Sequence, residues 1–150
     1  MDLSNFSQMI RFAMRKEEDA ADLYETYANL AERPSTKSIF RDLWEEEKKH
    51  KRLLEGVTKQ NIEDYKLTDI TNLKIAEYSV EEEFRPDMNF QEALLLAIKK
   101  EEKSQSLYNG LAQGTKDPQL KKLFQTLAQE EAKHKLKLEK EYDEHVLTWN

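Results

Sequence analysis

The chain has 150 residues and a mass of 17.8 kDa, which is the size of a single domain. Charged residues make up 36% of it and apolar residues 38%, whereas Gly and Pro contribute 3 residues each, so helix is favoured over sheet. The net charge of −6 leaves no positive excess for nucleic acid or an anionic membrane, and the absence of Cys excludes disulfides, zinc ribbons and iron–sulfur clusters. Any metal site must therefore use Glu, Asp and His.

The first residues of the chain do not resemble a targeting signal. Residues 1–6 carry neither the basic stretch nor the apolar stretch of a secretion signal. The longest apolar run, residues 93–98, is far shorter than the roughly 20 residues that a membrane-spanning helix needs. We therefore expect a soluble, cytoplasmic protein.

The chain contains an internal repeat at an offset of 84 residues. Residues 5–55 align with residues 89–139 without a gap, and 20 of the 51 aligned pairs are identical. The repeat predicts one domain over residues 1–150 that is built from two similar units, with residues 56–88 between them.

The first half of each unit has the periodicity of an amphipathic helix about seven turns long. Asn5 and Asn89 each stand three residues before a Gln or Glu, which is a variant of the capping box and predicts the helix starts. The apolar residues of the first unit recur at spacings of three and four: Ile10, Ala13, Ala20, Tyr24, Tyr27 and Ala31.

The second half of each unit predicts another helix. Pro34 and Pro118 mark the breaks, because Pro is tolerated in the first turn of a helix but disrupts its interior. The apolar positions on these helices are Phe40, Leu43 and Leu54 in one unit and Phe124, Leu127 and Leu138 in the other. Each unit is therefore predicted to be a helical hairpin.

The segment 56–88 is long enough to cross a whole bundle. Gly56 is read as the C-cap of the preceding helix, and residues 71–84 are read as a possible short helix. Two hairpins joined by one long crossover have the connectivity of a ferritin-like four-helix bundle, whereas a simple up-down bundle needs only a short loop there. The predicted fold class is all-α, with this architecture.

A Glu lies on the apolar face of each of the four helices of the two units, and the second helix of each unit adds a His. Residues three, four and seven apart lie on one face of a helix, so each position can be assigned a side. Six such residues point inward: Glu17, Glu47, His50, Glu101, Glu131 and His134. The spacing Glu-x-x-His places a carboxylate and an imidazole one turn apart on the same face, so that one ion can bind both.

Four converging buried carboxylates need a cation. They are costly to bury and repel one another, and two divalent metal ions would cancel four negative charges while using imidazole as a further ligand. One Glu-x-x-His arises easily by chance in a chain with 21 Glu, but two copies in equivalent repeat positions do not. We therefore predict a two-metal centre.

Some neighbouring residues have alternative interpretations. Glu18 and Glu102 also repeat, and are read as solvated or else as the ligands in place of the preceding Glu. Glu46 and Glu130 have the same two interpretations, with the solvated one preferred. The hydroxyls of Tyr24 and Tyr108 either belong to ordinary core aromatics or hydrogen-bond the metal ligands.

These motifs resemble those of the rubrerythrin branch of the ferritin-like superfamily over about two thirds of the chain. The matching residues run from Ala13 through Glu17 to Tyr24 with Glu47-Lys-Lys-His50, and again from Ala97 through Glu101 to Tyr108 with Glu131-Ala-Lys-His134. The resemblance implies two iron ions, with Glu17 and Glu101 as terminal ligands, Glu47 and Glu131 as bridging ligands, and one iron held by each of His50 and His134.

The resemblance also implies an activity: reduction of hydrogen peroxide or dioxygen by a non-haem di-iron oxidoreductase. The chain lacks the Cys residues of a rubredoxin domain, so the electron donor must be external. Ser104 stands where rubrerythrins have an extra Glu, and the remaining set of four Glu and two His is more similar to the ferroxidase site of bacterioferritins. The alternatives are a ferritin-like iron-storage protein with ferroxidase activity, or a bundle in which Mn or Zn is structural. A homodimer is expected by analogy with the family.

Overall fold

The computed structural model describes residues 6–59, 85 and 87–145, and these fold into four helices without a strand. The helices are α1 (Phe6–Leu30), α2 (Pro34–Lys59), α4 (Phe90–Gly114) and α5 (Pro118–His145). The prediction of an all-α fold is therefore confirmed. The predicted cap Asn5 and the short helix expected within residues 71–84 lie outside the described residues.

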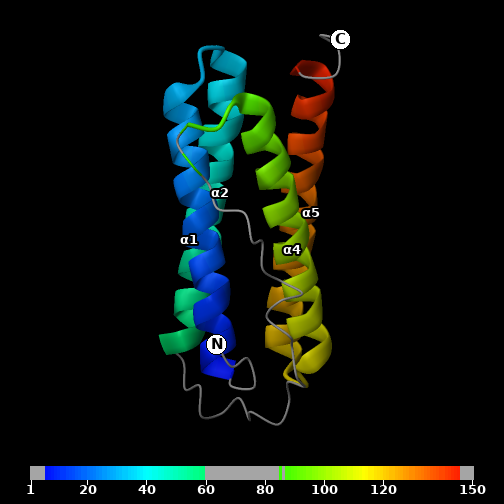
Figure 1. Ribbon diagram of the computed structural model, residues 1–150. Helices are drawn as coiled ribbons and strands as arrows, with labels where there is room; N and C mark the ends of the chain where they lie inside the picture. Colours follow the sequence, from blue (N-terminus) through cyan, green and yellow to red (C-terminus); the bar gives the residue numbers. More distant parts are fainter. Residues whose placement is uncertain (1–5, 60–84, 86, 146–150) are drawn as a thin grey trace.

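The four helices form two antiparallel hairpins that lie side by side (Figure 1). Helix α1 packs mainly against α2, and α4 packs mainly against α5. Helix α2 ends at the end of the bundle where α1 begins, whereas α4 begins at the opposite end (Figure 1). The end of α2 and the start of α4 therefore lie at opposite ends of the bundle, as predicted for a ferritin-like architecture.

The helix starts follow from their local sequences. The side chain of Asn89 accepts a hydrogen bond of 2.8 Å from the backbone N–H of Glu92, which is the predicted N-cap of α4. Helices α2 and α5 begin at Pro34 and Pro118, as predicted. Asp117 precedes the second of these and accepts hydrogen bonds from two backbone N–H groups of the first turn, at 2.9 and 3.0 Å.

The prediction that Gly56 caps its helix is wrong. Helix α2 continues through Gly56 to Lys59, and Gly56 has no positive φ. Gly inside a helix costs about 1 kcal/mol relative to Ala. Burial of Leu54 and Val57, which are 0% and 7% exposed, offsets that cost and extends the helix by a further turn.

The apolar core is divided into two layers, each built from all four helices. The layer nearer the start of α1 contains Met9, Ile10, Ala13, Leu54, Val57, Leu107, Leu111, Phe124 and Leu127. The other layer contains Ala20, Leu23, Tyr27, Phe40, Leu43, Leu94, Ala97 and Leu138. On every helix, the residues predicted to bind metal lie between these two layers.

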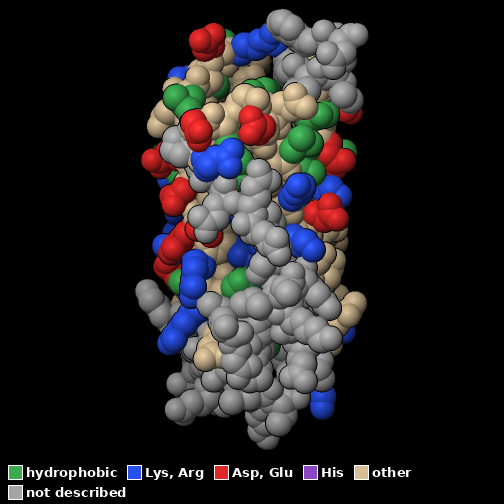
Figure 2. Space-filling model, in the orientation of Figure 1, with side chains coloured by type: hydrophobic (Ala, Val, Ile, Leu, Met, Phe, Trp, Pro, Cys, Tyr) green, Lys and Arg blue, Asp and Glu red, His purple; other side chains and the backbone are tan. Residues whose placement is uncertain are grey.

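The exterior carries charges of both signs. Figure 2 shows basic and acidic side chains intermixed on one face, and no histidine of the described residues is visible there. Within the described ranges, no helix is apolar and long enough to cross a membrane.

Candidate metal centre

The structure brings all six predicted residues together in the middle of the bundle. Each of the four helices contributes one Glu, and α2 and α5 each add a His one turn further along. All six side chains are at most 2% exposed: Glu17, Glu47, His50, Glu101, Glu131 and His134.

The two histidines contact carboxylates of the opposite hairpin more closely than those of their own. Nδ1 of His50 lies 2.9 Å from Oε1 of Glu131 and 3.8 Å from Oε2 of Glu47. Nδ1 of His134 lies 2.9 Å from Oε1 of Glu47 and 3.7 Å from Oε2 of Glu131. The hydrogen-bonded carboxylate of each His therefore comes from the other hairpin, and the pattern obeys the two-fold symmetry of the repeat.

The six residues form two overlapping ligand sets. In each set one atom per residue lies within 4.8 Å of the others. One set is Glu17, Glu47, His50 and Glu131, and the other is Glu47, Glu101, Glu131 and His134. Glu47 and Glu131 belong to both sets, which is the arrangement that two carboxylates bridging a pair of ions require.

Two buried carboxylate oxygens in this cluster have no hydrogen-bond partner. They are Oε2 of Glu17 and Oε2 of Glu101. Each lies near a His Nδ1, at 3.5 Å for Glu17 and His50 and at 3.6 Å for Glu101 and His134. Buried polar atoms are normally satisfied, so these oxygens are suited to a ligand such as a cation.

The residues present fit a pair of divalent ions. Carboxylate oxygen and imidazole nitrogen are ligands that iron, manganese and zinc all accept. Four carboxylates match the charge of two divalent cations, and each set offers a single imidazole. The donor set therefore fits a di-metal centre without specifying which metal occupies it.

Burial and mutual repulsion perturb the titration of the cluster. The pKa of Glu131 is raised well above 4.5, first by burial and then by the negative charges of Glu101 and Glu17. Burial lowers the pKa of His134, but the adjacent Glu101 carboxylate and the charges of the other nearby carboxylates outweigh it, so the net pKa is raised. Without a metal the cluster therefore retains protons that ordinary carboxyl groups would release.

The hydroxyls of both predicted tyrosines hydrogen-bond carboxylates of the cluster. The hydroxyl of Tyr108 donates to Oε1 of Glu17 at 2.5 Å, and the hydroxyl of Tyr24 donates to Oε1 of Glu101. Burial and the adjacent carboxylates raise the pKa of both phenols well above 10, so they remain protonated donors. Each hydroxyl fixes one oxygen of a carboxylate and leaves the other facing the histidines.

The neighbouring repeated glutamates behave differently from one another. Glu18 and Glu102 are exposed and pair with Lys51 and Lys135, as expected of solvated residues. The preferred solvated interpretation of Glu46 and Glu130 is incomplete, because both are half-buried and form a third group with the two histidines. Helices α2 and α5 lie side by side at this level, and helical periodicity does not reveal which helix is adjacent.

A pair of lysines near the cluster was missed by the sequence reasoning. Lys16 and Lys100, which precede the α1 and α4 glutamates, are both half-buried. Burial and the charge of Lys100 lower the pKa of Lys16 to about 8, while Glu131 and Glu17 act in the opposite direction. The signal was available, because Lys-Glu-Glu repeats at 16–18 and 100–102.

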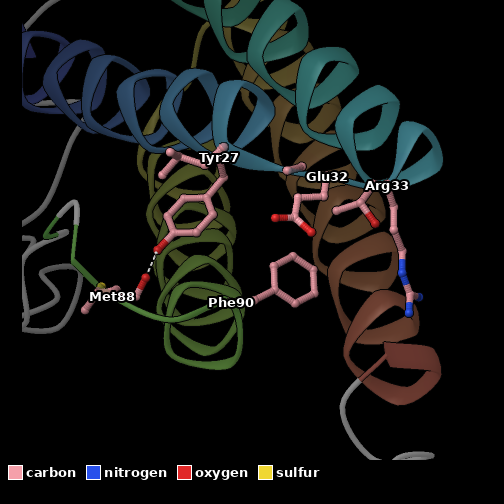
Figure 3. A pocket seen from close by; sticks show the side chains of 8 residues that line it. Tyr27, Glu32, Arg33, Met88 and Phe90 are labelled. Atoms are coloured by element: carbon pink, nitrogen blue, oxygen red, sulfur yellow. Dashed lines mark hydrogen bonds between the residues drawn. The ribbon is translucent and has the colours of Figure 1, made fainter.

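A separate cavity of about 390 Å³ lies at the end of the bundle near the α1–α2 connection. It is lined by residues that include Tyr27, Glu32, Arg33, Met88 and Phe90, and the Tyr27 hydroxyl donates to the Met88 carbonyl (Figure 3). None of the six buried Glu and His residues lines it. This cavity is therefore separate from the cluster of buried Glu and His residues.

Comparisons with known proteins agree with this geometry. A family model described as Rubrerythrin matches residues 8–142. A hypothetical protein from Pyrococcus furiosus is 24% identical with a TM-score of 0.78, covering 100% of this chain and 93% of its own. A Thermotoga maritima protein described as ferritin-like and diiron-carboxylate is 24% identical with a TM-score of 0.77, covering 97% of this chain and 96% of its own. None of the curated proteins compared with the chain matches it.

Proposed function

The chain belongs to the rubrerythrin family, and on this basis we propose that it is a non-haem di-iron oxidoreductase that reduces hydrogen peroxide or dioxygen. The electrons come from an external donor, since the chain contains no Cys with which to bind a rubredoxin-type iron. By family analogy the protein acts in the cytoplasm as a homodimer.

One observation carries this proposal: two four-residue ligand sets share Glu47 and Glu131. Shared carboxylates would hold two ions close enough to act on one small substrate, which isolated single-metal sites cannot do. Glu17 and Glu101 then complete the two sets as terminal ligands, and His50 and His134 each contribute to one of them.

Two ferrous ions held by these residues would supply two electrons, which with two protons reduce hydrogen peroxide to two water molecules. The protein positions the ligands and protects them. Tyr24 and Tyr108 hold the carboxylates of Glu101 and Glu17 by hydrogen bonds, so these side chains are oriented before a metal arrives. The apolar layers on either side limit the access of bulk water.

Anaerobic loading with ferrous iron followed by stopped-flow mixing with hydrogen peroxide tests the proposal. We expect the ferric absorption to develop in the wild-type chain and to be lost in Glu47→Gln, which removes a shared ligand. Glu102→Gln is the matched control, because this exposed carboxylate lies beside Lys135 and outside both ligand sets. A ferrous wild-type centre that peroxide leaves unoxidised would refute the enzyme proposal.

Iron storage with ferroxidase activity is the main alternative, and it needs a closed cage of many subunits. Size-exclusion chromatography separates the two: a dimer supports the oxidoreductase, whereas a very large particle supports storage. Metal analysis of the protein purified without added metal then distinguishes iron from structural manganese or zinc.

A further inference from the structure

A second group of metal-binding side chains lies beside the inner ligand sets. Glu46, His50, Glu130 and His134 each place one oxygen or ring nitrogen within 4.8 Å of the others. The two histidine rings are stacked, with centroids 5.5 Å apart and planes 10° apart. We call these four residues the outer cluster.

An unpartnered buried nitrogen points into the outer cluster. Nδ1 of His134 is engaged with Glu47 at 2.9 Å, but Nε2 has no hydrogen-bond partner although the side chain is 1% exposed. The Oε2 atom of Glu46 lies 3.7 Å from this nitrogen, beyond hydrogen-bond distance. A cation between the two atoms would satisfy both.

The outer cluster is also connected to solvent, unlike the inner ligands. The side chain of Glu46 is 38% exposed, whereas Glu47 is 1% exposed. Glu46 lines a surface cavity of about 340 Å³ between α2 and α5, together with two other carboxylates and three basic side chains. An ion from solvent can therefore reach Glu46 without passing through the apolar layers.

We propose that the outer cluster is a further binding site for divalent cations and that ions pass through it to reach the inner centre. This role as an entry site rests on the proposed di-metal function. Glu46 and Glu130 supply the carboxylates that first capture the ion, and the ring of His134 connects the two sites.

The chemistry of imidazole explains why the outer ion is transferred onward. A neutral ring has one N–H and one lone pair. An ion held at Glu46 would bind the lone pair of Nε2 of His134 and displace any proton there, while Nδ1 keeps its proton toward Glu47. When Nδ1 binds an inner ion, the proton of the neutral ring must lie on Nε2, facing the Glu46 carboxylate, and Nε2 has no lone pair for an outer ion. Filling the inner centre therefore removes a ligand from the outer cluster.

Cobalt(II) uptake measured by stopped-flow absorption tests the entry site. The double variant Glu46→Gln/Glu130→Gln should load at least about tenfold more slowly than wild type and reach the same final cobalt content. The matched control is Glu18→Gln/Glu102→Gln. It removes the same number of negative charges from another pair of repeat-related positions, on α1 and α4, and should load within about twofold of wild type. Circular dichroism confirms that both variants are folded.

The outcomes separate this inference from the proposed function. Equal rates for wild type and the outer variant, or equal slowing in both double variants, would overturn the entry site while leaving the di-metal function intact. A wild-type chain that takes up no cobalt would overturn both.

Binding at the outer cluster can also be measured directly. Glu17→Gln/Glu101→Gln weakens both inner sets, and we expect residual cobalt binding in isothermal titration calorimetry. That binding should disappear when Glu46 and Glu130 are also changed to Gln. Identical residual binding with and without the two outer glutamates would show that the outer cluster does not bind cations.

Discussion

The hydrogen bond between Tyr108 and Glu17 provides a sharp test of how the carboxylates are held. In Tyr108→Phe, Oε1 of Glu17 loses the hydroxyl that donates to it at 2.5 Å, and Oε2 already has no partner. A hydrogen bond to a charged group contributes about 1.5–3 kcal/mol, and Glu17 is too deeply buried for water to replace it. The melting temperature of the chelator-treated protein should therefore fall by roughly 3–10 °C.

Tyr27→Phe is the matched control for this substitution. The Tyr27 hydroxyl is also buried, but it donates to the neutral carbonyl of Met88, in the apolar layer away from the cluster. Loss of a neutral hydrogen bond costs about 0.5–1.5 kcal/mol and should not depend on metal. The penalty of Tyr108→Phe should shrink when a divalent ion is added, because the ion then binds Glu17.

Thermal denaturation followed by circular dichroism, with chelator and with added manganese, measures both effects. A double-mutant cycle with Glu17→Gln isolates the pairwise interaction. If Tyr108→Phe costs no more than Tyr27→Phe, and metal changes neither, then the hydroxyl does not organise the carboxylate and this reasoning is refuted.

Three further results are expected. Removing the metal should lower the melting temperature more at pH 8 than at pH 5. The raised pKa values of Glu131 and His134 stabilise the metal-free chain fully below pH 4.5, where both groups are protonated in the folded and unfolded chains, and this contribution is lost as the pH rises through the folded-state pKa values. The lowered pKa of Glu101 contributes stability above pH 4.5 and therefore acts at both pH values. Equal losses at the two pH values would contradict a buried cluster. Glu47→Gln should weaken manganese binding at least about tenfold by calorimetry while Glu102→Gln leaves it unchanged, and equal effects would exclude Glu47 as a ligand. Gly56→Ala should raise the free energy of unfolding by about 0.5–1 kcal/mol in urea, because the added Cβ meets nothing within 4 Å; a loss of stability would count against a helical Gly56.

Local periodicity allowed the sequence to predict which side chains face inward. Glu47 and His50 lie one turn apart on any α-helix, so their common face follows from the spacing alone. Glu131 and His134 are the repeat equivalents of Glu47 and His50, so they also share one face of their helix. The positions of Pro34 and Pro118 predicted the hairpin breaks for the equally local reason that Pro lacks a backbone N–H.

The partner of each inward-facing group was decided only by the packing of one hairpin against the other. His50 contacts Glu131 at 2.9 Å, although its own helix offers Glu47, because side chains project across the bundle rather than along one helix. The same packing makes Glu46 half-buried and places it near the ring of His134. Periodicity assigns a residue to a face, but the neighbour of that face depends on the arrangement of all four helices, which exists only in the tertiary structure.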